Sequence, residues 1–360
     1  MNVPTPPPHL DVPETMEHKR VSAADVAQKA GVSRTTVSFV VNNTPGKNIS
    51  EDTRQRVLAA MQDLGYTPDE RARRVAMARR QTVGLYVRHS QYVYTDAFIV
   101  RTIEGMSQAV NRHRVQLIIQ PISQSYTGNY VDLVRQDNLD GIILINTQAS
   151  DAGLNDLITE QFPVVSLDDL GDTLAIDQVF VDNRGAACQI VEYLIGLGHR
   201  RIAMITHAAP TFTASSARLA GYRDALEAAN IPYSEDLVRY ADFSEQSGHD
   251  AMLDLLSLPK LPTAVFAGND VVAYGALLAS REAEISVPEE VSVVGFDDDY
   301  LSRYMSPALT TVALPASGMG STAVSLLVER LSDPDSIRKP RRLVLPTHIS
   351  IRSSATNPPT

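Results

Sequence analysis

The sequence contains a single cysteine, Cys188, among its 360 residues. One cysteine cannot form a disulfide within the chain or a cysteine-based metal site, and its neighbours are typical of a packed helix. The first 17 residues contain no lysine, no arginine and no long apolar run, so we expect neither a signal peptide nor a membrane anchor there. These absences favour a protein of the reducing cytoplasm.

Signatures of common enzyme classes are also missing. The sequence has no nucleophile elbow, phosphate-binding loop, kinase signature or metal-spaced pair of histidines. His199 precedes an apolar run and is expected to be a turn or surface residue rather than a catalytic base. We therefore expect no enzymatic activity, no cofactor and no metal site.

What the sequence does contain is an uneven distribution of charge. The whole chain carries 32 Lys and Arg against 42 Asp and Glu, a net charge of −10. Residues 1–18 hold three acids, residues 19–80 hold twelve Lys and Arg against six acids, and the rest of the chain is strongly acidic. A basic segment on an acidic body favours a polyanionic partner for that segment, with a solvated charged surface as the alternative. The proline-rich residues 1–18 are expected to be a disordered tail.

Residues 19–66 have the pattern of three short helices around one small core. A capping box beginning at Ser22 starts a first helix, and Gly31 supplies the turn after it. Ser33 can cap a second helix, and a third follows from Ser50. Two short helices joined by a tight glycine turn are typical of a helix-turn-helix, in which the second helix enters the major groove of DNA.

The second helix, Arg34 to Asn42, supplies side chains suited to reading base edges. Arg34 can form two hydrogen bonds with guanine, Thr35 can bond a base or touch a methyl group, and Phe39 offers an apolar contact to thymine. The headpiece residues expected to contact DNA are Ser22, Ser33, Arg34, Thr35, Thr36, Ser38, Phe39 and Asn42. Helix pairs with a glycine turn also occur in proteins that do not bind DNA, so the motif alone leaves that alternative open.

From Thr82 onward, short apolar runs alternate with amphipathic segments. The runs lie at residues 83–87, 115–119 and 141–145, and again at 201–205, 264–268 and 291–296. Continuous apolar runs separated by helices indicate parallel strands covered on both faces, and two successive sets indicate two doubly wound lobes. The expected fold class is α/β: a small all-helical headpiece and a two-lobed parallel-sheet domain like that of periplasmic binding proteins.

Polar residues follow several of these runs, where open parallel sheets bind their ligands. Asp168 follows one run, Asn269 and Asp297 follow two others, and Arg218 begins a helix after a fourth. Acids, an amide and an arginine can hold hydroxyl groups, while aromatic side chains can stack on a sugar ring. The alternative for any acid here is a helix cap, and Asp270 and Asp298 are the likeliest caps.

The run from Asp25 to Asn42, DVAQKAGVSRTTVSFVVN, closely resembles the helix-turn-helix of the lactose-repressor (LacI/GalR) family of bacterial regulators. The similarity continues through Leu64 to Pro68 and Arg71 to Arg74, and resumes through the body to about residue 352. A pattern of this length is specific, unlike any single short motif in the chain.

This resemblance implies that residues 67–81 form a hinge whose helix enters the minor groove at the operator centre. Arg73 is expected to contact phosphate. Val75 takes the position of the side chain, leucine in most of the family, that wedges between base pairs. Because valine is shorter and β-branched, we expect a shallower kink or a different central base step.

The resemblance also implies an effector site. Arg218, Asn269 and Asp297 match effector-contacting positions of the family, and Phe98, Ile99 and Phe243 match its apolar lining. With the two further residues suggested by the pattern, the expected effector-binding set is Phe98, Ile99, Asp168, Phe212, Arg218, Phe243, Asn269 and Asp297.

The expected protein is a DNA-binding repressor of carbohydrate-utilisation genes. Its affinity for a near-palindromic operator would be switched by a small molecule, expected to be a sugar, and it would act as a cytoplasmic, nucleoid-associated homodimer without a membrane partner.

The expected parts are a tail (1–18), the headpiece (19–66), the hinge (67–81), an effector-binding and dimerisation domain (82–353) and a tail (354–360). Lobe one would hold about 82–181 and 313–341, and lobe two about 182–312 and 342–353. A free solute-binding protein of the same two-lobed design is the main alternative, but it would not need residues 19–80.

Overall fold

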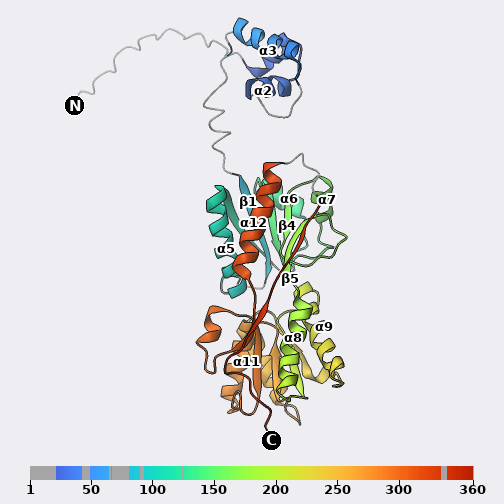
Figure 1. Cartoon of the computed structure of the whole chain (residues 1–360), viewed down its shortest axis with the longest axis vertical. Coiled ribbons are helices and arrows are strands. Elements are labelled where there is room, and N and C mark those ends of the chain that lie inside the picture. The colour runs from blue at the N-terminus through green and yellow to red at the C-terminus, as the bar shows by residue number, and fades with distance from the viewer. Residues whose placement is uncertain are drawn as a thin grey trace, which may run out of the picture. The chain divides into compact units, whose positions relative to one another are not determined.

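The computed structural model describes residues 22–42, 49–64, 66, 81–89, 93–123, 125–333 and 339–359. They belong to two separate units, a headpiece within Met1–Arg79 and a body within Arg80–Thr360 (Figure 1). The expected tail 1–18 and the hinge residues Arg73 and Val75 lie outside the described residues, as do the side chains of Ser38 and Asn42.

The headpiece consists of α1 (Ala23–Ala30), α2 (Arg34–Asn42) and α3 (Glu51–Asp63). Each helix begins after a serine whose hydroxyl oxygen accepts an amide hydrogen bond, at 3.4 Å for Ser22, 3.1 Å for Ser33 and 3.3 Å for Ser50. Gly31 ends α1 with a φ of 65°, a backbone conformation that favours glycine. The three helices enclose one core of Val26, Ala27, Ala30, Val37, Val40, Val57 and Ala60.

Lobe one of the body is built on a six-stranded sheet in the order β11-β5-β4-β3-β1-β2, with every neighbouring pair parallel. The strands are β1 (Thr82–His89), β2 (Gln116–Ser123), β3 (Gly141–Ile145), β4 (Val164–Ser166), β5 (Asp177–Val181) and β11 (Arg342–Leu345). The helices are α5 (Ala97–His113), α6 (Tyr130–Gln136), α7 (Leu154–Thr159) and α12 (Ala316–Ser332).

Lobe two repeats this plan in the order β12-β10-β9-β8-β6-β7, where only the β10–β12 pair is antiparallel among the described strands. The strands are β6 (Ile202–Thr206), β7 (Val238–Tyr240), β8 (Ala264–Ala267), β9 (Ser292–Asp297), β10 (Thr310–Ala313) and β12 (His348–Ser350). The helices are α8 (Asn183–Gly196), α9 (Thr213–Ala228), α10 (Glu245–Leu256) and α11 (Asp270–Glu282), with 3-10 turns at Glu235–Leu237 and Tyr300–Arg303.

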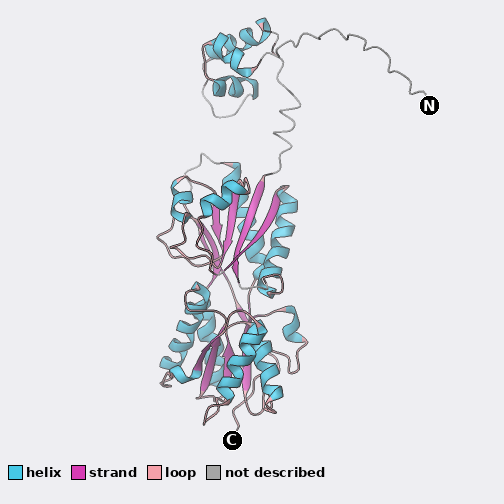
Figure 2. Ribbon diagram, turned by 180° about the vertical axis from the view of Figure 1, so that it is seen from behind, coloured by secondary structure: helices cyan, strands magenta, loops and turns pink. Residues whose placement is uncertain are grey.

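Helices cover both faces of each sheet (Figure 2). This explains why β3, β5, β6, β8 and β9 are buried along their whole length, as their continuous apolar runs predict. On one face of lobe one, α5 and α12 touch backbone to backbone: a Cβ at Gly105 would lie 1.9 Å from the carbonyl oxygen of Ser317. The predicted two-lobed, doubly wound class is confirmed.

The chain crosses between the lobes three times, between β5 and α8, between β10 and α12, and between β11 and β12 (Figure 1). The prediction that lobe two begins again at residue 342 is wrong, because β11 extends the first sheet by pairing in parallel with β5, Leu343 opposite Val179. Lobe one therefore keeps the chain through Leu345.

The expected C-terminal tail is also wrong for residues 354–359, which pack along lobe two. Ser354 is fully buried, donates to the carbonyl oxygen of Val293 at 2.5 Å and accepts from the amide of Thr310 at 2.8 Å. This segment covers His199, which the sequence predicted to be a turn or surface residue: it directly follows the turn at Leu197 and Gly198 but is buried. Its Nδ1 lies 2.9 Å from the Thr263 hydroxyl, and its Nε2 lies 2.8 Å from the carbonyl oxygen of Thr356. Burial lowers the pKa of His199, consistent with a structural role.

Candidate DNA-binding and effector-binding sites

In the headpiece, the first turn of α2 presents polar side chains to solvent. Arg34 and Thr35 are exposed, whereas Thr36 and Phe39 are partly buried. The opposite side of α2 is fixed, because Val37 and Val40 belong to the headpiece core. Arg34 and Thr35 therefore lie where a groove-binding helix needs them.

The predicted DNA contacts Ser22 and Ser33 also have structural roles. Ser22 donates its hydroxyl to the Asp25 carboxylate at 2.7 Å in a complete capping box. The Ser33 hydroxyl lies 2.9 Å from that of Thr36 and accepts the Thr36 amide. These hydroxyls hold the starts of α1 and α2, so contact with DNA would be a second use of the same groups.

In lobe two, Arg218 joins the carboxyl ends of several strands. Its guanidinium donates to Asn183 Oδ1 at 2.9 Å and to the carbonyl oxygen of Gly268 at 2.5 Å, and lies 3.8 Å from Asp297 Oδ1. It also lies 3.7 Å from the centre of the Phe296 ring. Three segments of lobe two, the start of α8, the residue after β8 and the end of β9, thus converge on one buried cation.

Burial dominates the electrostatics of this pair. Arg218 and Asp297 have 7% and 9% of their side-chain surface exposed. Loss of water raises the pKa of Asp297 well above its usual value, and the Arg218 charge opposes this shift. Loss of water likewise lowers the pKa of Arg218, opposed by Asp297. Each partner therefore favours the charged form of the other, against the effect of burial.

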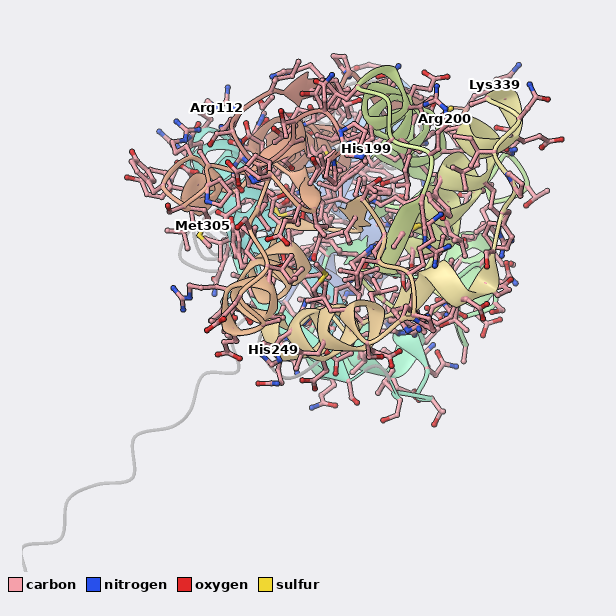
Figure 3. The ribbon with its side chains drawn as sticks, turned by 90° about the horizontal axis from the view of Figure 1, so that it is seen from below. Arg112, His199, Arg200, His249, Met305 and Lys339 are labelled. Carbon is pink, nitrogen blue, oxygen red and sulfur yellow. The ribbon has the colours of Figure 1, made fainter. Side chains whose placement is uncertain are left out.

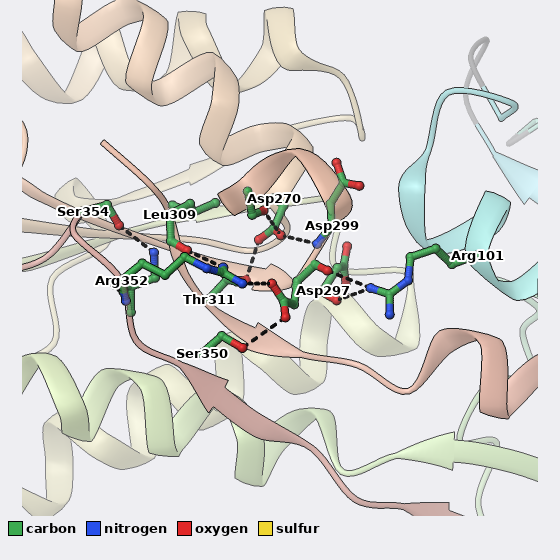
Figure 4. A network of polar contacts seen from close by, with 12 residues as sticks. Arg101, Asp270, Asp297, Asp299, Leu309, Thr311, Ser350, Arg352 and Ser354 are labelled. Atoms are coloured by element: carbon green, nitrogen blue, oxygen red, sulfur yellow. Dashed lines mark hydrogen bonds and ion pairs between the residues drawn. The ribbon is translucent and has the colours of Figure 1, made fainter. Parts of the chain in front are cut away.

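Asn269 takes the helix-capping role that the sequence suggested for Asp270. Asn269, a predicted effector contact, caps α11 by accepting the amide of Val272 at 2.9 Å. Asp270 is not the expected cap: its carboxylate accepts the hydroxyls of Ser302 and Thr311, each at 2.5 Å (Figure 4). Burial raises the pKa of Asp270 to about 7, despite these bonds.

Asp298, the other expected cap, instead anchors the chain that follows β9. Its carboxylate accepts Arg352 Nη2 at 2.5 Å and the Ser350 hydroxyl at 3.0 Å, because β12 runs beside this turn. Asp297 and Asp298 both have positive φ, 121° and 54°. Non-glycine residues rarely adopt such values, and they gather at ligand sites when the surrounding contacts hold them.

Arg101 of lobe one binds this turn from across the junction (Figure 4). Its Nη1 donates to the carbonyl oxygen of Asp298 at 2.7 Å and to that of Asp297 at 3.4 Å. A second bond between the lobes runs from Gln148 Nε2 to the carbonyl oxygen of Thr211 at 3.0 Å. Arg101 thus connects lobe one to the residue whose side chain pairs with Arg218.

On the lobe-one side, the predicted residues are less closely grouped. Asp168 is buried after β4 and accepts the amide of Thr147 at 2.8 Å; burial raises its pKa to about 7. Phe98 and Ile99 lie in the first turn of α5, where Ile99 is 1% exposed and belongs to the main core and Phe98 packs against that core. Ile99 therefore contributes mainly to packing.

Aromatic rings meet at the junction around Phe243. The ring of Phe212 lies edge-on to it at 5.2 Å, and that of His207 at 5.4 Å. His89, the last residue of β1, contacts Phe243 from lobe one, with the centres of the two rings 4.6 Å apart. Its Nε2 lies 3.2 Å from Asp96 Oδ2. The sequence had singled out Phe212 and Phe243 but not the two histidines. Both follow predicted strands, so the strand-end argument would have found them.

A cavity of about 400 Å³ lies between the two lobes. Its walls include the ends of β4 and β5 from lobe one and the first turns of α8 and α9 from lobe two, with Asp168 as the one predicted effector residue among them. Another cavity, of about 580 Å³, lies in lobe two beside α11 and the segment Met305–Pro307, away from these strand ends. In the described part of the chain, no three His, Cys, Asp or Glu side chains are grouped to hold a metal, and no helix is long and apolar enough to span a membrane.

A helix-turn-helix unit combined with a two-lobed body that buries charged and aromatic groups between its lobes defines a DNA-binding regulator with a ligand-binding domain. Residues 22–69 match the model of bacterial regulatory proteins of the LacI family, and residues 191–355 match that of the periplasmic binding protein-like domain. The chain belongs to the LacI family of bacterial transcription regulators.

Curated relatives match nearly the whole chain. The HTH-type transcriptional regulator CelR of Thermobifida fusca is 35% identical over 94% of this chain and 100% of its own length. The HTH-type transcriptional repressor PurR of Escherichia coli O139:H28 is 34% identical over 89% of this chain and 94% of its own. Both relatives are transcription regulators.

Solved structures agree with the fold. A complex of the transcriptional regulator CelR with cellobiose has a TM-score of 0.68 and 33% identity, and covers 93% of this chain and 100% of its own. The lac repressor dimer bound to operator and the anti-inducer ONPF has a TM-score of 0.66 and 26% identity, and covers 94% of this chain and 100% of its own. The predicted family and class of function are confirmed.

Proposed function

We propose that this regulator is a dimeric repressor of carbohydrate-utilisation genes that binds a near-palindromic operator through α2, and that a sugar bound between its lobes weakens this binding. The observation that carries the proposal is the combination of two surfaces. Arg34 and Thr35 are exposed at the start of α2. Arg218, Asp297 and Phe243 are buried where the two lobes of the body meet.

The DNA contacts follow from the geometry of the helix-turn-helix. With α2 in the major groove, Arg34 reads guanine and Thr35 an adjacent base, while Phe39 contacts a thymine methyl. Ser22, Ser33, Thr36, Ser38 and Asn42 complete the proposed headpiece contacts. Arg73 and Val75 remain predicted contacts to phosphate and to the minor groove.

A sugar effector is supported by the chemistry of the junction and by two solved relatives. A carbohydrate ring needs hydrogen-bonding groups for its hydroxyls and an aromatic face for its carbon atoms. Asp168, Arg218 and Asp297 supply the first, and Phe212 and Phe243 supply the second. The CelR complex contains cellobiose, and a LacI-family regulator from Enterococcus faecium was solved with bound ribose.

The switch is proposed to act through the fit between the lobes. Arg101 and Gln148 already connect them, and Asp297 carries both an effector-facing carboxylate and a carbonyl that binds Arg101. A ligand that alters this arrangement changes whether the two hinge segments can order together on DNA. Coupling of about 1–3 kcal/mol corresponds to a 5- to 150-fold change in operator affinity.

Dimerisation through the body is supported by exposed apolar side chains. Leu278, Tyr300, Leu301 and Tyr304 are 39–64% exposed. Leu278 and Met305 line the 580 Å³ cavity in lobe two, so the exposed side chains lie near a recess in the same surface. A dimer presents two copies of α2 to two operator half-sites, which is why the operator is expected to be near-palindromic. Such a repressor works in the cytoplasm, on the nucleoid, without enzymatic activity.

The test starts from the full chain and an operator selected from random duplex DNA. Fluorescence anisotropy at 150 mM salt measures affinity for the selected duplex, for a scrambled duplex, and for the selected duplex with cellobiose or ribose. We expect sequence preference of at least a thousandfold, in the range of specific DNA-binding proteins, and a sugar-dependent loss of affinity. The proposal fails if the chain prefers no sequence, or if no sugar changes its affinity.

A further inference from the structure

His207 directly follows β6, at the junction of the two lobes. It is 5% exposed, and its Nδ1 has no hydrogen-bond partner, one of four such buried side-chain atoms among the residues that the structure describes. A buried polar atom without a partner is uncommon because the atom has lost its water and gained nothing in exchange. Such an atom can accept a hydrogen bond from, or donate one to, a polar group of a bound molecule.

The surroundings of His207 are those of the proposed effector site. Its ring lies edge-on to Phe243 at 5.4 Å. A Cβ at Gly268 would lie 3.2 Å from Nδ1 and 2.6 Å from the His207 backbone nitrogen, so only glycine allows this approach. Arg218 donates to the carbonyl oxygen of the same Gly268 at 2.5 Å. The imidazole and the guanidinium therefore meet at one peptide.

The imidazole of His207 is uncharged. Burial lowers its pKa well below the usual value, and the charge of the nearby Arg218 acts in the same direction. A neutral imidazole has one donor and one acceptor nitrogen. A hydroxyl group both donates and accepts, so it fits whichever role Nδ1 takes.

The positive charges of the junction arginines are already paired with acceptors of the protein, although the buried Nε of Arg88 has no hydrogen-bond partner. Arg218 is held by a carbonyl oxygen, by Asn183 and, at 3.8 Å, by Asp297. Arg88 lies 2.8 Å from Asp151, and Arg101 donates to backbone carbonyls. An anionic ligand would have to compete with these acceptors for positive charge, while a neutral hydroxyl needs only the imidazole.

We propose that His207 Nδ1 hydrogen-bonds a hydroxyl of the effector, and that the effector is a neutral sugar rather than a sugar acid or a sugar phosphate. This inference rests on the proposed function, since it concerns the same site. His207 is then a specificity-determining residue: it holds one hydroxyl of the ligand in place beside the Phe243 ring.

The test uses isothermal titration of the full-length chain with neutral sugars, cellobiose, glucose and ribose, and with glucuronate and glucose 6-phosphate as charged counterparts of glucose. The variants are His207→Leu, which removes the polar atom, and His207→Gln, which keeps a hydrogen-bonding group. His199→Gln is the matched control, because His199 is also buried but has both ring nitrogens bonded within the protein.

We expect the wild-type chain to bind a neutral sugar and to bind the charged counterparts at least tenfold more weakly. His207→Leu should weaken the neutral sugar at least tenfold, His207→Gln less, and His199→Gln not at all. Operator affinity without sugar, measured on the same samples, should stay unchanged and shows that each variant is folded.

Two results overturn the inference and leave sugar-controlled repression standing: preferred binding of a charged sugar, or unchanged affinity of His207→Leu for the neutral sugar. If no sugar binds the wild-type chain, the inference fails together with the sugar part of the proposed function, and only the operator experiment then bears on DNA binding.

Discussion

The headpiece and the body hold their charged residues in opposite ways. In the headpiece, Arg34 is exposed, and the ion pair of Lys29 with Asp63 joins two exposed side chains. In the body, Arg218 and Asp297 pair with less than a tenth of either side chain exposed. A surface group can change without altering the fold, whereas removing one partner of a buried pair leaves an uncompensated group that destabilises the fold. Recognition of DNA should therefore be separable from stability, and recognition of the effector should not.

Arg218→Ala gives the strongest test of this contrast. The substitution leaves Asp297 buried beside its lost partner, and breaking a buried pair costs about 3–5 kcal/mol. We expect that loss in the free energy of unfolding, measured by urea denaturation, together with loss of the sugar response. Operator affinity should stay within a few fold of wild type.

Arg223→Ala is the control for this variant. Arg223 lies on the same helix, α9, and pairs with Glu235 at 3.3 Å with 46% of its side chain exposed. It should change stability by no more than about 0.5 kcal/mol and leave the sugar response intact. If Arg218→Ala behaves like this control, the buried pair is not part of the effector site, and recognition of the effector is separable from stability after all.

Asp168→Asn tests the body through pH. Burial raises the pKa of Asp168 from 3.8 to about 7, so the folded state holds this proton more tightly than the unfolded chain does. The contribution of this group to stability is therefore fully present below pH 4 and is lost as the pH rises toward 7. Between pH 5 and 8 we expect the wild-type chain to lose up to about 3 kcal/mol relative to Asp168→Asn.

Urea denaturation of both proteins at pH 5, 6, 7 and 8 measures this difference. Asp169→Asn is the control, because Asp169 is the next residue but is exposed and pairs with Arg342. Parallel curves for wild type and Asp168→Asn would show that Asp168 keeps an ordinary pKa despite its burial.

Arg101→Ala should have an effect between those of an exposed and a fully buried charged residue, because the Arg101 side chain is partly buried and joins the lobes. A hydrogen bond from a charged group contributes about 1.5–3 kcal/mol, and here part of it stabilises lobe contact rather than either lobe alone. We expect a smaller loss of stability than for Arg218→Ala but a clear change in the sugar concentration that releases the operator.

Arg112→Ala is the control for Arg101→Ala, because Arg112 lies near the end of the same helix and is exposed (Figure 3). Anisotropy titrations with sugar at fixed operator concentration compare the two. Equal midpoints for Arg101→Ala and wild type would mean that the bonds to Asp297 and Asp298 do not take part in the switch.

The sequence predicted the elements whose burial is continuous. The apolar runs of β1, β3, β6, β8 and β9 identify strands because both faces of a parallel sheet are covered. β11 could not be assigned to its lobe in this way, since Arg342–Leu345 alternates exposed and partly buried residues at a sheet edge. Its partner is set by a crossing of the chain that local pattern does not encode.

The candidate sites divide in the same manner. Asp297 was predicted because it stands at the end of an apolar run, and Arg218 because it matches a position of the family. His89 and His207 also stand at strand ends, but only acids, an amide and an arginine were predicted there. Arg101 could not be found at all, because its partners lie 196 and 197 residues away and are backbone carbonyls, which carry no sequence signal.

Arg34→Ala should have the smallest effect on the fold, and it tests the headpiece half of the comparison: recognition of DNA should be separable from stability. Arg34 is exposed at the start of α2, so its loss should change the free energy of unfolding by no more than about 0.5 kcal/mol. A bidentate contact to guanine discriminates by about 1–3 kcal/mol, so the variant should lose preference at one position of each operator half-site while its other preferences persist. The measurement is anisotropy against a set of single-base operator variants, with Gln28→Ala, another exposed headpiece residue, as the control. A uniform loss across all operator variants would assign Arg34 to phosphate instead, because a phosphate contact weakens every sequence alike.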